Sequence, residues 1–433
     1  MQLLPRPLER AYRGSQIGYT AGCVWLRYKL PSWRDRVLGR DPAARDLSGI
    51  HLSNAEQIFE TATRLRGLLI KMCQVIGTRS DVFPPQYVRT LSKTHDAVPP
   101  HDLADIQGVI EEDFGKPLDA VFSEFEPKPV AAASLAQVHR ARLADGRPVA
   151  VKVQYPDIGH IVNVDLSSVR RICQIYEYWD PQPIELLPLL DEMNNHLRYE
   201  LDFEREVRSA DRIRGLFADD PSVVIPEIYH DWSTRRVITM EYVDGIKVTD
   251  TEALEASGID AAEVNQGLMR IYTQMILAHG FFQADPHPGN IFIQPGPRLV
   301  ILDFGLAKEL PKGFGMGLFE LMFSMMTFNE ASMIRAFDEL GFETESGNKQ
   351  TYVELARRMI DRSDNRMFEG EFTEGMTDEL FEGIRQNPIV KVPTDFVLVA
   401  RAFSLLSGIA HSLGHRANVL EAMAPGSSRL RAG

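Results

Sequence analysis

An Asp-Gly turn between two strand-like runs predicts a β-hairpin in the first half of the chain. The runs cover residues 135–143 and 148–155, and Asp145-Gly146 lies between them, which is a strong short-range hairpin signal. Side chains alternate between the two faces of a strand, so Lys152 and Ala150 point away from the neighbouring valines. These valines are Val149, Val151 and Val153. We expect the valines to enter a core and Lys152 to lie on the opposite face.

Helical patterns flank the hairpin. From His51 to about Arg79, apolar side chains recur at steps of three and four, which is typical of one helix with a single apolar stripe. Ser53 and Glu56 have the spacing of a capping box near its start. A second helical region is expected from Asp165 to Leu216. The stripe of the first helix consists of Ile58, Ala62, Leu65, Leu69, Met72 and Ile76.

Short strands and further helices follow. Residues 223–243 predict two strands, and residues 291–293 and 299–302 predict another pair joined by a turn that contains Pro295-Gly296. From Gly313 onward the pattern is mostly helical, and no internal repeat is present.

Composition excludes several classes of protein. The chain has 433 residues and a formal net charge of −13, and repulsion from phosphates makes such a chain a poor general binder of nucleic acid. Three cysteines without a C-x-x-C pair disfavour a structural zinc site and indicate a reducing compartment. The Met1 end lacks an apolar segment followed by a cleavage site, which disfavours secretion. The cysteines are Cys23, Cys73 and Cys173.

No apolar stretch has the length of a membrane span, which takes roughly 18 residues. The two nearest candidates are interrupted by charge, because residues 396–410 contain Arg401 and residues 316–328 contain Glu320. We expect both segments to be buried helices, and we expect the protein to be cytoplasmic or peripheral on a membrane.

The first 40 residues are basic within an acidic chain. Eight Arg and Lys side chains face only Glu9 and Asp35, a local charge of +6 (8 minus 2), and Trp and Leu residues are interleaved with them. Interfacial helices use this combination on an anionic membrane surface. Two other interpretations stay open: a helix that packs on the protein's own acidic body, or an Arg-rich organelle transit segment. The eight are Arg6, Arg10, Arg13, Arg27, Lys29, Arg34, Arg36 and Arg40.

Carboxylate and amide side chains in the second half have the spacing used for phosphoryl transfer. Asp285 is followed by Asn290, then by the second strand pair and by Asp303-Phe304-Gly305. Phosphoryl transfer needs a carboxylate near the nucleophile and oxygen ligands that hold Mg²⁺ on the phosphates. D-x-x-x-x-N and D-F-G occur in this order in protein kinases, with a strand lysine upstream. We therefore expect Asp285 to act on the nucleophile, Asn290 and Asp303 to ligate Mg²⁺, and Lys152 to hold phosphate oxygens of ATP or ADP.

The order of elements agrees with this chemistry. We predict an α+β, two-lobed, kinase-like fold with a five-stranded N-lobe, a helical C-lobe and a helical N-terminal extension. The predicted segments are a basic amphipathic segment at 1–50, the extension at 51–118, the N-lobe at 119–245 and the C-lobe at 246–433.

Four segments resemble the UbiB family of atypical kinases, which serve coenzyme Q and related isoprenoid-lipid metabolism. The segments are Ala131–His139, Glu200-Leu201-Asp202, Ala284–Asn290 and Leu302–Gly305. The resemblance runs from about residue 69 to about 310, and more weakly through 396–408. An alanine-rich loop combined with A-D-P-H-P-G-N is highly specific to that family.

The resemblance implies roles for further residues. The alanine-rich loop would cover the phosphates in place of a glycine-rich loop, and it would be stiffer because each alanine has a Cβ atom. In the family this loop favours ADP and suppresses peptide phosphorylation. Glu206 would pair with Lys152, and Glu200 would meet Lys71 from the first helix. The loop residues are Ala131, Ala132, Ala133 and Ser134, the adenine-side strand and hinge contribute Met240, Glu241 and Val243, and the regulatory set is Lys71, Gln74, Glu200 and Asp202.

The chain departs from familiar patterns at three places. The family signature Lys-x-Gly-Gln here contains Cys73, which we expect to be a buried thiol rather than a redox-sensitive site. No Ala-Pro-Glu follows Asp303, and Gln283-Ala284 replaces the usual His-Arg, which argues against conventional peptide kinases. His287, between two prolines, is expected to shape its loop rather than bind a metal.

We therefore expect an ATPase or small-molecule kinase in ubiquinone or related isoprenoid-lipid metabolism. Its expected partners are a nucleotide with Mg²⁺, an isoprenoid or quinone-like lipid and an anionic membrane surface, with no nucleic acid. A Ser/Thr protein kinase and a nucleotide-binding pseudokinase scaffold are the alternatives.

Overall fold

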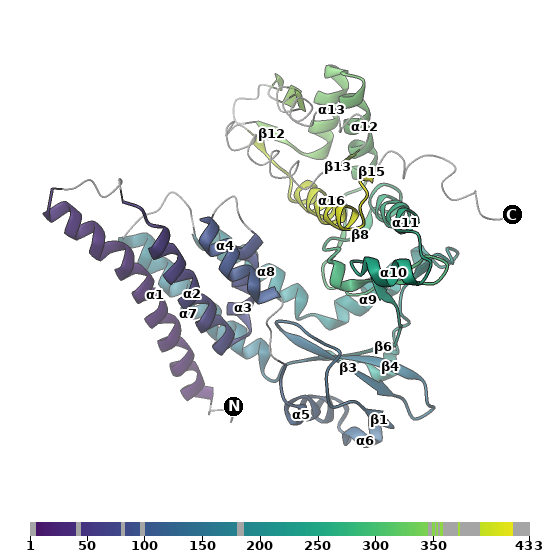
Figure 1. Ribbon diagram of the computed structural model, residues 1–433, viewed down its shortest axis with the longest axis horizontal. Helices are drawn as coiled ribbons and strands as arrows, with labels where there is room; N and C mark the ends of the chain where they lie inside the picture. Colours follow the sequence, from purple (N-terminus) through teal and green to yellow (C-terminus); the bar gives the residue numbers. More distant parts are fainter. Residues whose placement is uncertain are drawn as a thin grey trace. The chain divides into compact units, whose positions relative to one another are not determined.

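In the computed structural model, the predicted hairpin is formed by β3 (Ala136–Arg142) and β4 (Pro148–Gln154), at the centre of a five-stranded sheet (Figure 1). Strand β6 (Val237–Glu241) pairs with β4, and β1 (Glu124–Phe125) and β2 (Ala131–Ala132) pair with β3. All the pairs are antiparallel. The prediction of a five-stranded sheet around this hairpin is thus confirmed.

The valines of β4 enter the core, as their alternation with Lys152 predicted. Val149, Val151 and Val153 are fully buried and pack against α5 (Leu103–Phe114) and α7 (Ile158–Trp179). Ala150 and Lys152 are half-buried on the other face. Burying apolar surface at about 25 cal/mol per Å² makes this layer a main source of stability for the sheet.

The chain divides into two units. The first comprises Met1–Phe203 and Tyr229–Glu241, and the second comprises Glu204–Ile228 and Tyr242–Gly433. The structure describes residues 6–39, 45–78, 83–95, 100–179, 186–344, 349–350, 352–353, 356–357, 371–372 and 390–418. Arg40 and Arg79, named in the sequence analysis, lie outside these ranges. The predicted segment boundaries at 50, 118 and 245 divide the chain differently and stay a prediction.

Helices precede and flank the sheet in the first unit. Helix α1 (Arg6–Val37) packs along α2 (Ser48–Leu65) and α7, and α3 (Leu68–Thr78) follows α2 (Figure 1). The remaining helices of this unit are α4 (Pro85–Leu91), α6 (Leu118–Val121) and α8 (Leu186–Glu200), with a 3₁₀ turn at Ser92–His95.

The single helix predicted from His51 to Arg79 is wrong, because the helix is broken after Leu65. Arg66 and Gly67 both have left-handed φ values, 58° and 60°, and Gly67 is the residue type that ends helices in this way. The predicted capping box is also wrong. Helix α2 begins at Ser48, whose N–H is accepted by the side chain of Asp46, so Ser53 and Glu56 lie inside the helix.

The helical region predicted from Asp165 to Leu216 is divided as well. Helix α7 begins earlier, at Ile158, and α8 ends at Glu200, before α9 (Phe203–Leu216) begins. Asp202 therefore lies between α8 and α9 and belongs to neither helix.

The two strands predicted within residues 223–243 exist but belong to different sheets. Strand β5 (Val223–Val224) pairs with β10 (Arg298–Ile301) in the second unit, whereas β6 belongs to the first. The predicted pair of β9 (Ile291–Gln294) and β10 is confirmed. Strand β7 (Ile246–Lys247) completes that sheet, and β8 (Phe281–Gln283) pairs with β11 (Ala307–Glu309).

The second unit is otherwise mainly helical, as predicted. Helix α11 (Ala261–Thr273) continues as a π-helical turn at Gln274–His279. Helices α12 (Phe314–Met326) and α16 (Thr394–Ser412) contain the two charge-interrupted apolar segments. Buried side chains anchor both helices, but α12 exposes Met316, Phe319 and Phe323, so the prediction of full burial is wrong for α12. Further elements are α10 (Thr251–Ala256), α13 (Glu330–Leu340) and the pairs β12 (Glu343–Thr344) with β14 (Val390–Lys391) and β13 (Glu371–Phe372) with β15 (Ala417–Asn418).

A buried ion pair attaches α1 to α7. Arg13 Nε and Nη2 donate to the two carboxylate oxygens of Asp165 at 2.7 and 2.6 Å, and Arg13 Nη1 donates to the carbonyl of Leu65 at 2.8 Å. The two charged side chains are 4% and 0% exposed. Burial raises the pKa of Asp165, and the guanidinium of Arg13 opposes that rise.

We expect Arg13→Leu to lower the free energy of unfolding by about 3–5 kcal/mol in urea titrations at neutral pH, because it leaves a buried carboxylate unpaired. Without Arg13, the native-state pKa of Asp165 rises further above its unfolded value, so the loss should shrink as the pH falls and the carboxyl takes up a proton. Arg10→Leu, an exposed change on the same helix, serves as the control. Arg13→Leu with Asp165→Leu should recover most of the stability, and a loss below about 1 kcal/mol for the single change would contradict this account.

Cys73 lies in a small core between α2, α3 and α4. It is 1% exposed, packs with Ala55, Ala62 and Leu91, and burial raises its pKa to about 12. This confirms a buried thiol at the position where the family signature has glycine.

We expect thiol reagents at about pH 8 to modify Cys23 well before Cys73, because only the thiolate reacts and a pKa of about 12 leaves almost none. Peptide mapping by mass spectrometry after timed alkylation measures the order. In urea all three cysteines should react alike, and labelling of native Cys73 as fast as Cys23 would refute its burial.

Candidate active site

Lys152 occupies a defined position on the central strand of the first unit. Its register partners are Val138 on β3 and Ile238 on β6, and its Nζ lies 5.3 Å from the centre of the Phe203 ring. Both neighbouring strands are long enough to fix this position. The cation therefore lies on the face opposite the valine core, as predicted.

The alanine-rich loop is tied down at Ala133. Ala131 and Ala132 form β2, the N–H of Ala133 donates to the carbonyl of Ala136 at 2.8 Å, and Ser134 is buried. The hydroxyl of Tyr155 donates to the carbonyl of Ala133, also at 2.8 Å. Both polar groups of the Ala133 backbone are thus used, which fixes the loop where a glycine-rich loop would be mobile.

The β9–β10 hairpin brings Asn290 and Asp303 together. Ile291 pairs with Ile301, and the N–H of Leu302 donates to the carbonyl of Asn290 at 2.9 Å. Asn290 is therefore paired with Leu302, the residue that directly precedes Asp303, and residues paired in this way lie roughly 5 Å apart at their Cα atoms. Asp303 has a left-handed φ of 63°, and its Oδ1 accepts the N–H of Gly305 at 3.1 Å.

A buried glutamine joins Asp285 to Asp303. Gln283 Nε2 donates to the backbone carbonyl of Asp285 at 2.6 Å and to that of Asp303 at 3.3 Å. Its Oε1 accepts the hydroxyl of Tyr272 at 2.8 Å. Gln283 is 2% exposed and Tyr272 is fully buried, so one side-chain amide holds both backbones in place. Gln283 was noted in the sequence only as a departure from His-Arg, and its position two residues before the aspartate is the signal.

Asp285 makes an ion pair with the C-terminal helix. Arg401 Nη2 on α16 lies 3.1 Å from Asp285 Oδ1, with the side chains 50% and 29% exposed. Lys308 Nζ lies 3.2 Å from Asp395 Oδ1, which gives α16 a second ion pair with this region. Sequence reasoning missed this role of Arg401. The signal was its isolation in an otherwise apolar helical segment, since lone charges in apolar segments usually have a partner.

Helix α9 approaches the D-F-G segment. Arg205 donates to the carbonyls of Gly305 and Ala307 at 2.9 and 2.6 Å. Glu206 is buried, and a Cβ built on Gly305 would lie 3.6 Å from its Oε2 and 3.4 Å from Asp303 Oδ1. Glu206 is thus beside the D-F-G glycine. Its predicted pairing with Lys152 stays a prediction, because the two residues belong to different units.

The regulatory residues lie in the first unit. Lys71 on α3 forms an ion pair with Glu200 at the end of α8, as the resemblance implied. Gln74, one turn further along α3, donates to the carbonyl of Thr94 at 3.2 Å. Asp202 lies in the short segment between α8 and α9. The Lys71–Glu200 ion pair therefore links α3 to the end of α8 within the first unit.

The predicted adenine-side residues lie at the end of β6. Met240 is half-buried and pairs with Ala150, and Glu241 is exposed and pairs with Val149. Glu241 is the last residue of the first unit, and Val243 belongs to the second. Their contact with adenine stays a prediction.

His287 shapes its loop, as predicted. Its Nδ1 accepts the N–H of Gly289 at 3.1 Å, and a Cβ on Gly289 would come within 3.0 Å of the same atom. The glycine after Pro288 therefore permits the tight turn that ends at Asn290.

The donor set fits Mg²⁺ bound to a nucleotide. No cluster of three or more His, Cys, Asp or Glu side chains that could hold a metal occurs among the described residues. Asn290 and Asp303 offer one amide and one carboxylate oxygen, and no hydrogen bond to the Asn290 side chain is found within the described part of the chain. Mg²⁺ commonly takes one or two protein ligands and completes its shell with phosphates and water. The pair could hold the ion only together with such phosphates.

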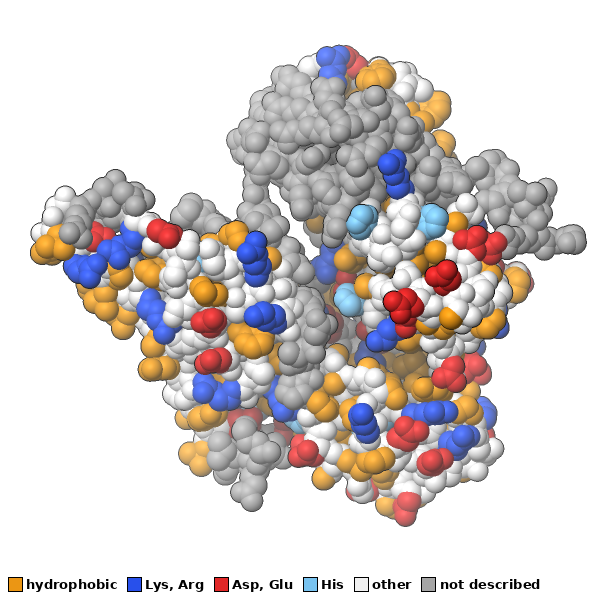
Figure 2. Space-filling view, viewed as in Figure 1, with side chains coloured by type: hydrophobic (Ala, Val, Ile, Leu, Met, Phe, Trp, Pro, Cys, Tyr) orange, Lys and Arg blue, Asp and Glu red, His pale blue; other side chains and the backbone are white. Residues whose placement is uncertain are grey.

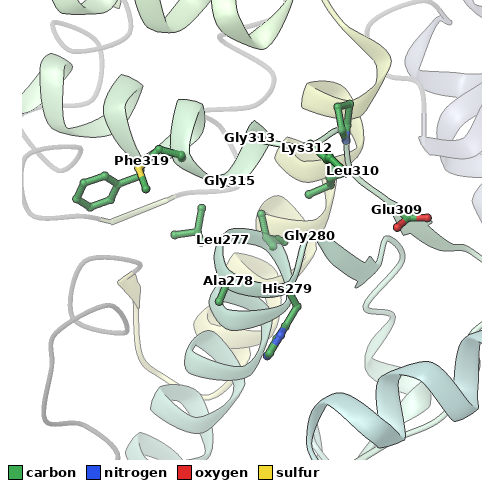
Figure 3. Close-up of a pocket in the computed structure, with 13 residues that line it drawn as sticks. Leu277, Ala278, His279, Gly280, Glu309, Leu310, Lys312, Gly313, Gly315 and Phe319 are labelled. Atoms are coloured by element: carbon green, nitrogen blue, oxygen red, sulfur yellow. The ribbon is translucent and has the colours of Figure 1, made fainter.

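A separate pocket of about 590 Å³ lies in the second unit (Figure 3). The end of the π-helical turn and the start of α12 form its walls, and Phe319 and Lys312 line it. Its lining includes none of the predicted site residues.

None of the helices within the described residues has the length and apolar character needed to cross a bilayer.

Comparison with known proteins supports the resemblance. A family model described as the ABC1 atypical kinase-like domain matches residues 93–337. AarF domain-containing protein kinase 1 of Xenopus laevis is 33% identical over 85% of this chain and 72% of its own length. The chloroplastic protein activity of BC1 complex kinase 8 of Arabidopsis thaliana is 30% identical over 86% of this chain and 53% of its own length. A Synechocystis protein is 34% identical, and this chain spans 64% of its length.

A solved structure shows the same fold. The Mycobacterium tuberculosis protein Rv3197, determined in complex with erythromycin, aligns with a TM-score of 0.57 at 20% identity, over 84% of this chain and 93% of its own. Together with the family match and the mixed helix-and-sheet architecture, this gives a two-lobed kinase-like fold with a helical N-terminal region. The chain belongs to the UbiB/AarF family of ABC1 atypical kinase-like proteins.

Proposed function

We propose that this protein binds a Mg²⁺-nucleotide and acts as an ATPase or a small-molecule kinase that supports ubiquinone or related isoprenoid-lipid metabolism. The observation that supports this best is the placement of Asp285, Asn290 and Asp303. The carbonyl of Asn290 accepts the N–H of Leu302, the residue directly before Asp303, and Gln283 donates to the backbone carbonyls of both Asp285 and Asp303.

Each of the candidate site residues has its own role in the proposed phosphoryl transfer. Lys152 would hold phosphate oxygens of the nucleotide, and Asn290 and Asp303 would hold Mg²⁺, which would supply positive charge to the transferring phosphoryl group. Asp285 orients the nucleophile and accepts its proton. Because Arg401 lies on Oδ1, we assign Oδ2 to the nucleophile. Mutual positioning of these groups accounts for most of the catalysis in such reactions.

Two features favour a small substrate or water over a peptide. Residues 306–313 are all that separates D-F-G from α12, and they include β11. Conventional peptide kinases place an activation loop and Ala-Pro-Glu in this region. A Ser/Thr protein kinase stays the first alternative, and phosphorylation of a peptide library by the wild-type protein would favour it. A pseudokinase scaffold stays the second, and nucleotide binding without turnover, even with a quinone-like lipid added, would favour that.

We expect Asp303→Asn to abolish the Mg²⁺-dependent part of nucleotide binding, because it removes the only carboxylate of the metal pair. At about 100 times its Kd, ADP with Mg²⁺ should stabilise the wild type by about 2.7 kcal/mol, measured by thermal unfolding with and without the metal. Glu255→Gln, an exposed change on α10, is the matched control. ATP hydrolysis that is unchanged in Asp303→Asn would overturn the proposal.

We expect Gln283→Leu to lower turnover by about tenfold or more and to raise the Mg²⁺ concentration needed for half-maximal activity, because Asp285 and Asp303 lose their common hydrogen-bond donor. Urea unfolding of the same variant should show a loss of about 1–3 kcal/mol. Tyr272→Phe removes one hydrogen bond from the same amide but leaves both backbone contacts in place, so its Mg²⁺ dependence should match the wild type. An unchanged Mg²⁺ dependence in Gln283→Leu would contradict this role, because it would show that Gln283 stabilises the fold without positioning Asp285 and Asp303.

A further inference from the structure

Helix α1 exposes a series of apolar side chains along one face, which we call the apolar stripe. Tyr19, Leu26, Leu30, Trp33 and Val37 are all exposed, from 43% for Leu26 to 85% for Val37. Each residue turns an α-helix by about 100°, which places these five side chains within about 60° of one another around the helix axis. At a rise of about 1.5 Å per residue the stripe is roughly 27 Å long. Single exposed apolar side chains are normal, but an aligned series of this length indicates a contact surface.

The opposite face of α1 is fixed to the protein. Besides the Arg13–Asp165 pair, the hydroxyls of Thr20 and Thr61 lie 2.9 Å apart. The hydroxyl of Tyr28 lies 2.6 Å from His51 Nδ1 and 2.9 Å from that of Tyr87. These contacts set the rotation of the helix about its axis. The apolar stripe is therefore held outward.

Basic side chains border the stripe on both sides. Arg27 and Arg34 follow one edge, and Lys29 and Arg36 follow the other, by the same helical spacing. Arg34 and Arg36 are exposed, whereas the acidic Asp35 is buried and accepts both hydrogen bonds of Arg45 at 2.7 Å. Figure 2 shows hydrophobic and basic side chains intermingled over α1, at the left of the view. The local field beside the stripe is thus positive in a chain of net charge −13.

The charges distinguish between two partners. The stripe has the heptad spacing of a coiled-coil seam, which a second copy of this chain could match. In such a dimer both flanking positions would be basic on both helices, and like charges across the seam repel. An anionic lipid surface meets the same cations with opposite charge and takes Trp and Leu side chains at the depth of its headgroups.

We propose that α1 lies on an anionic membrane surface, with Leu26, Leu30, Trp33 and Val37 in the interface and Arg34 and Arg36 on lipid phosphates. The surface is separate from the nucleotide residues, and the proposal is independent of the proposed function. The outward face of α1 thus binds the membrane surface that the sequence analysis left open, and the inward face packs on the protein.

Vesicle co-sedimentation of the full chain tests this. Vesicles of equal parts phosphatidylcholine and phosphatidylglycerol should bind the protein at least tenfold more tightly than phosphatidylcholine alone, and added salt should weaken the binding. Leu26→Ser with Leu30→Ser should reduce binding by at least about tenfold. Arg34→Gln with Arg36→Gln should reduce it by a similar factor, since each cation near such a surface contributes about fivefold.

Controls separate lipid contact from other effects. Phe323→Ser, an exposed apolar change on α12, should leave binding unchanged. Trp33→Phe should still bind but lose most of the blue shift in tryptophan fluorescence that vesicles cause. Equal binding to neutral vesicles, binding unaffected by the α1 variants, or dimerisation in lipid-free light scattering that Leu26→Ser with Leu30→Ser abolishes would each overturn the proposal. The last result would assign the stripe to a second copy instead.

Discussion

The buried side-chain amide of Gln283 is the interaction on which the candidate active site depends. An amide in the interior is unfavourable unless its donors and acceptor are all used, and here Tyr272 and two backbone carbonyls use them. Burial, and then the charge of Asp285, raises the pKa of Tyr272, so its hydroxyl keeps its proton and remains a donor. Asp303 needs such support because its left-handed φ is unfavourable for a residue with a Cβ. One buried amide thus positions two aspartates from different segments.

In the first unit, a chain of buried polar contacts connects the helical extension to the alanine-rich loop. His101 stacks on Tyr155 with ring centres 4.2 Å apart, and Tyr155 bonds to Ala133. The backbone N–H of His101 donates to Gln137, which in turn lies 2.8 Å from His139 Nε2. Burial lowers the pKa of both histidines, so this network stays uncharged at neutral pH. The extension is therefore part of the support for the loop rather than an appendage.

The features that were predicted correctly from the sequence are those that depend on residues close together in the chain. The Asp-Gly hairpin, the face taken by Lys152 and the β9–β10 pair follow from neighbouring residues and were predicted from the sequence. The break at Arg66-Gly67 was missed because the apolar period continues across it, although Gly67 itself was a signal. The assignment of β5 and β6 to different sheets, and the contacts of Arg205 and Arg401, depend on residues about a hundred positions away. No period or spacing in the sequence encodes such distances.

Helix α1 shows how a buried charge can determine what a surface presents. Replacing a buried ion pair by apolar residues is often neutral or stabilising, so the Arg13–Asp165 pair is a weak source of stability. Its geometry is nevertheless specific, since two parallel hydrogen bonds accept only one rotation of the helix. A rotation by one residue, about 100°, would remove Arg13 from Asp165 and turn the apolar stripe toward the side of the protein. The composition of this segment fitted both a membrane surface and the protein's own body, because composition does not show which side chains share a face of the helix. The Arg13–Asp165 ion pair turns one face toward the protein and leaves the apolar stripe on the other.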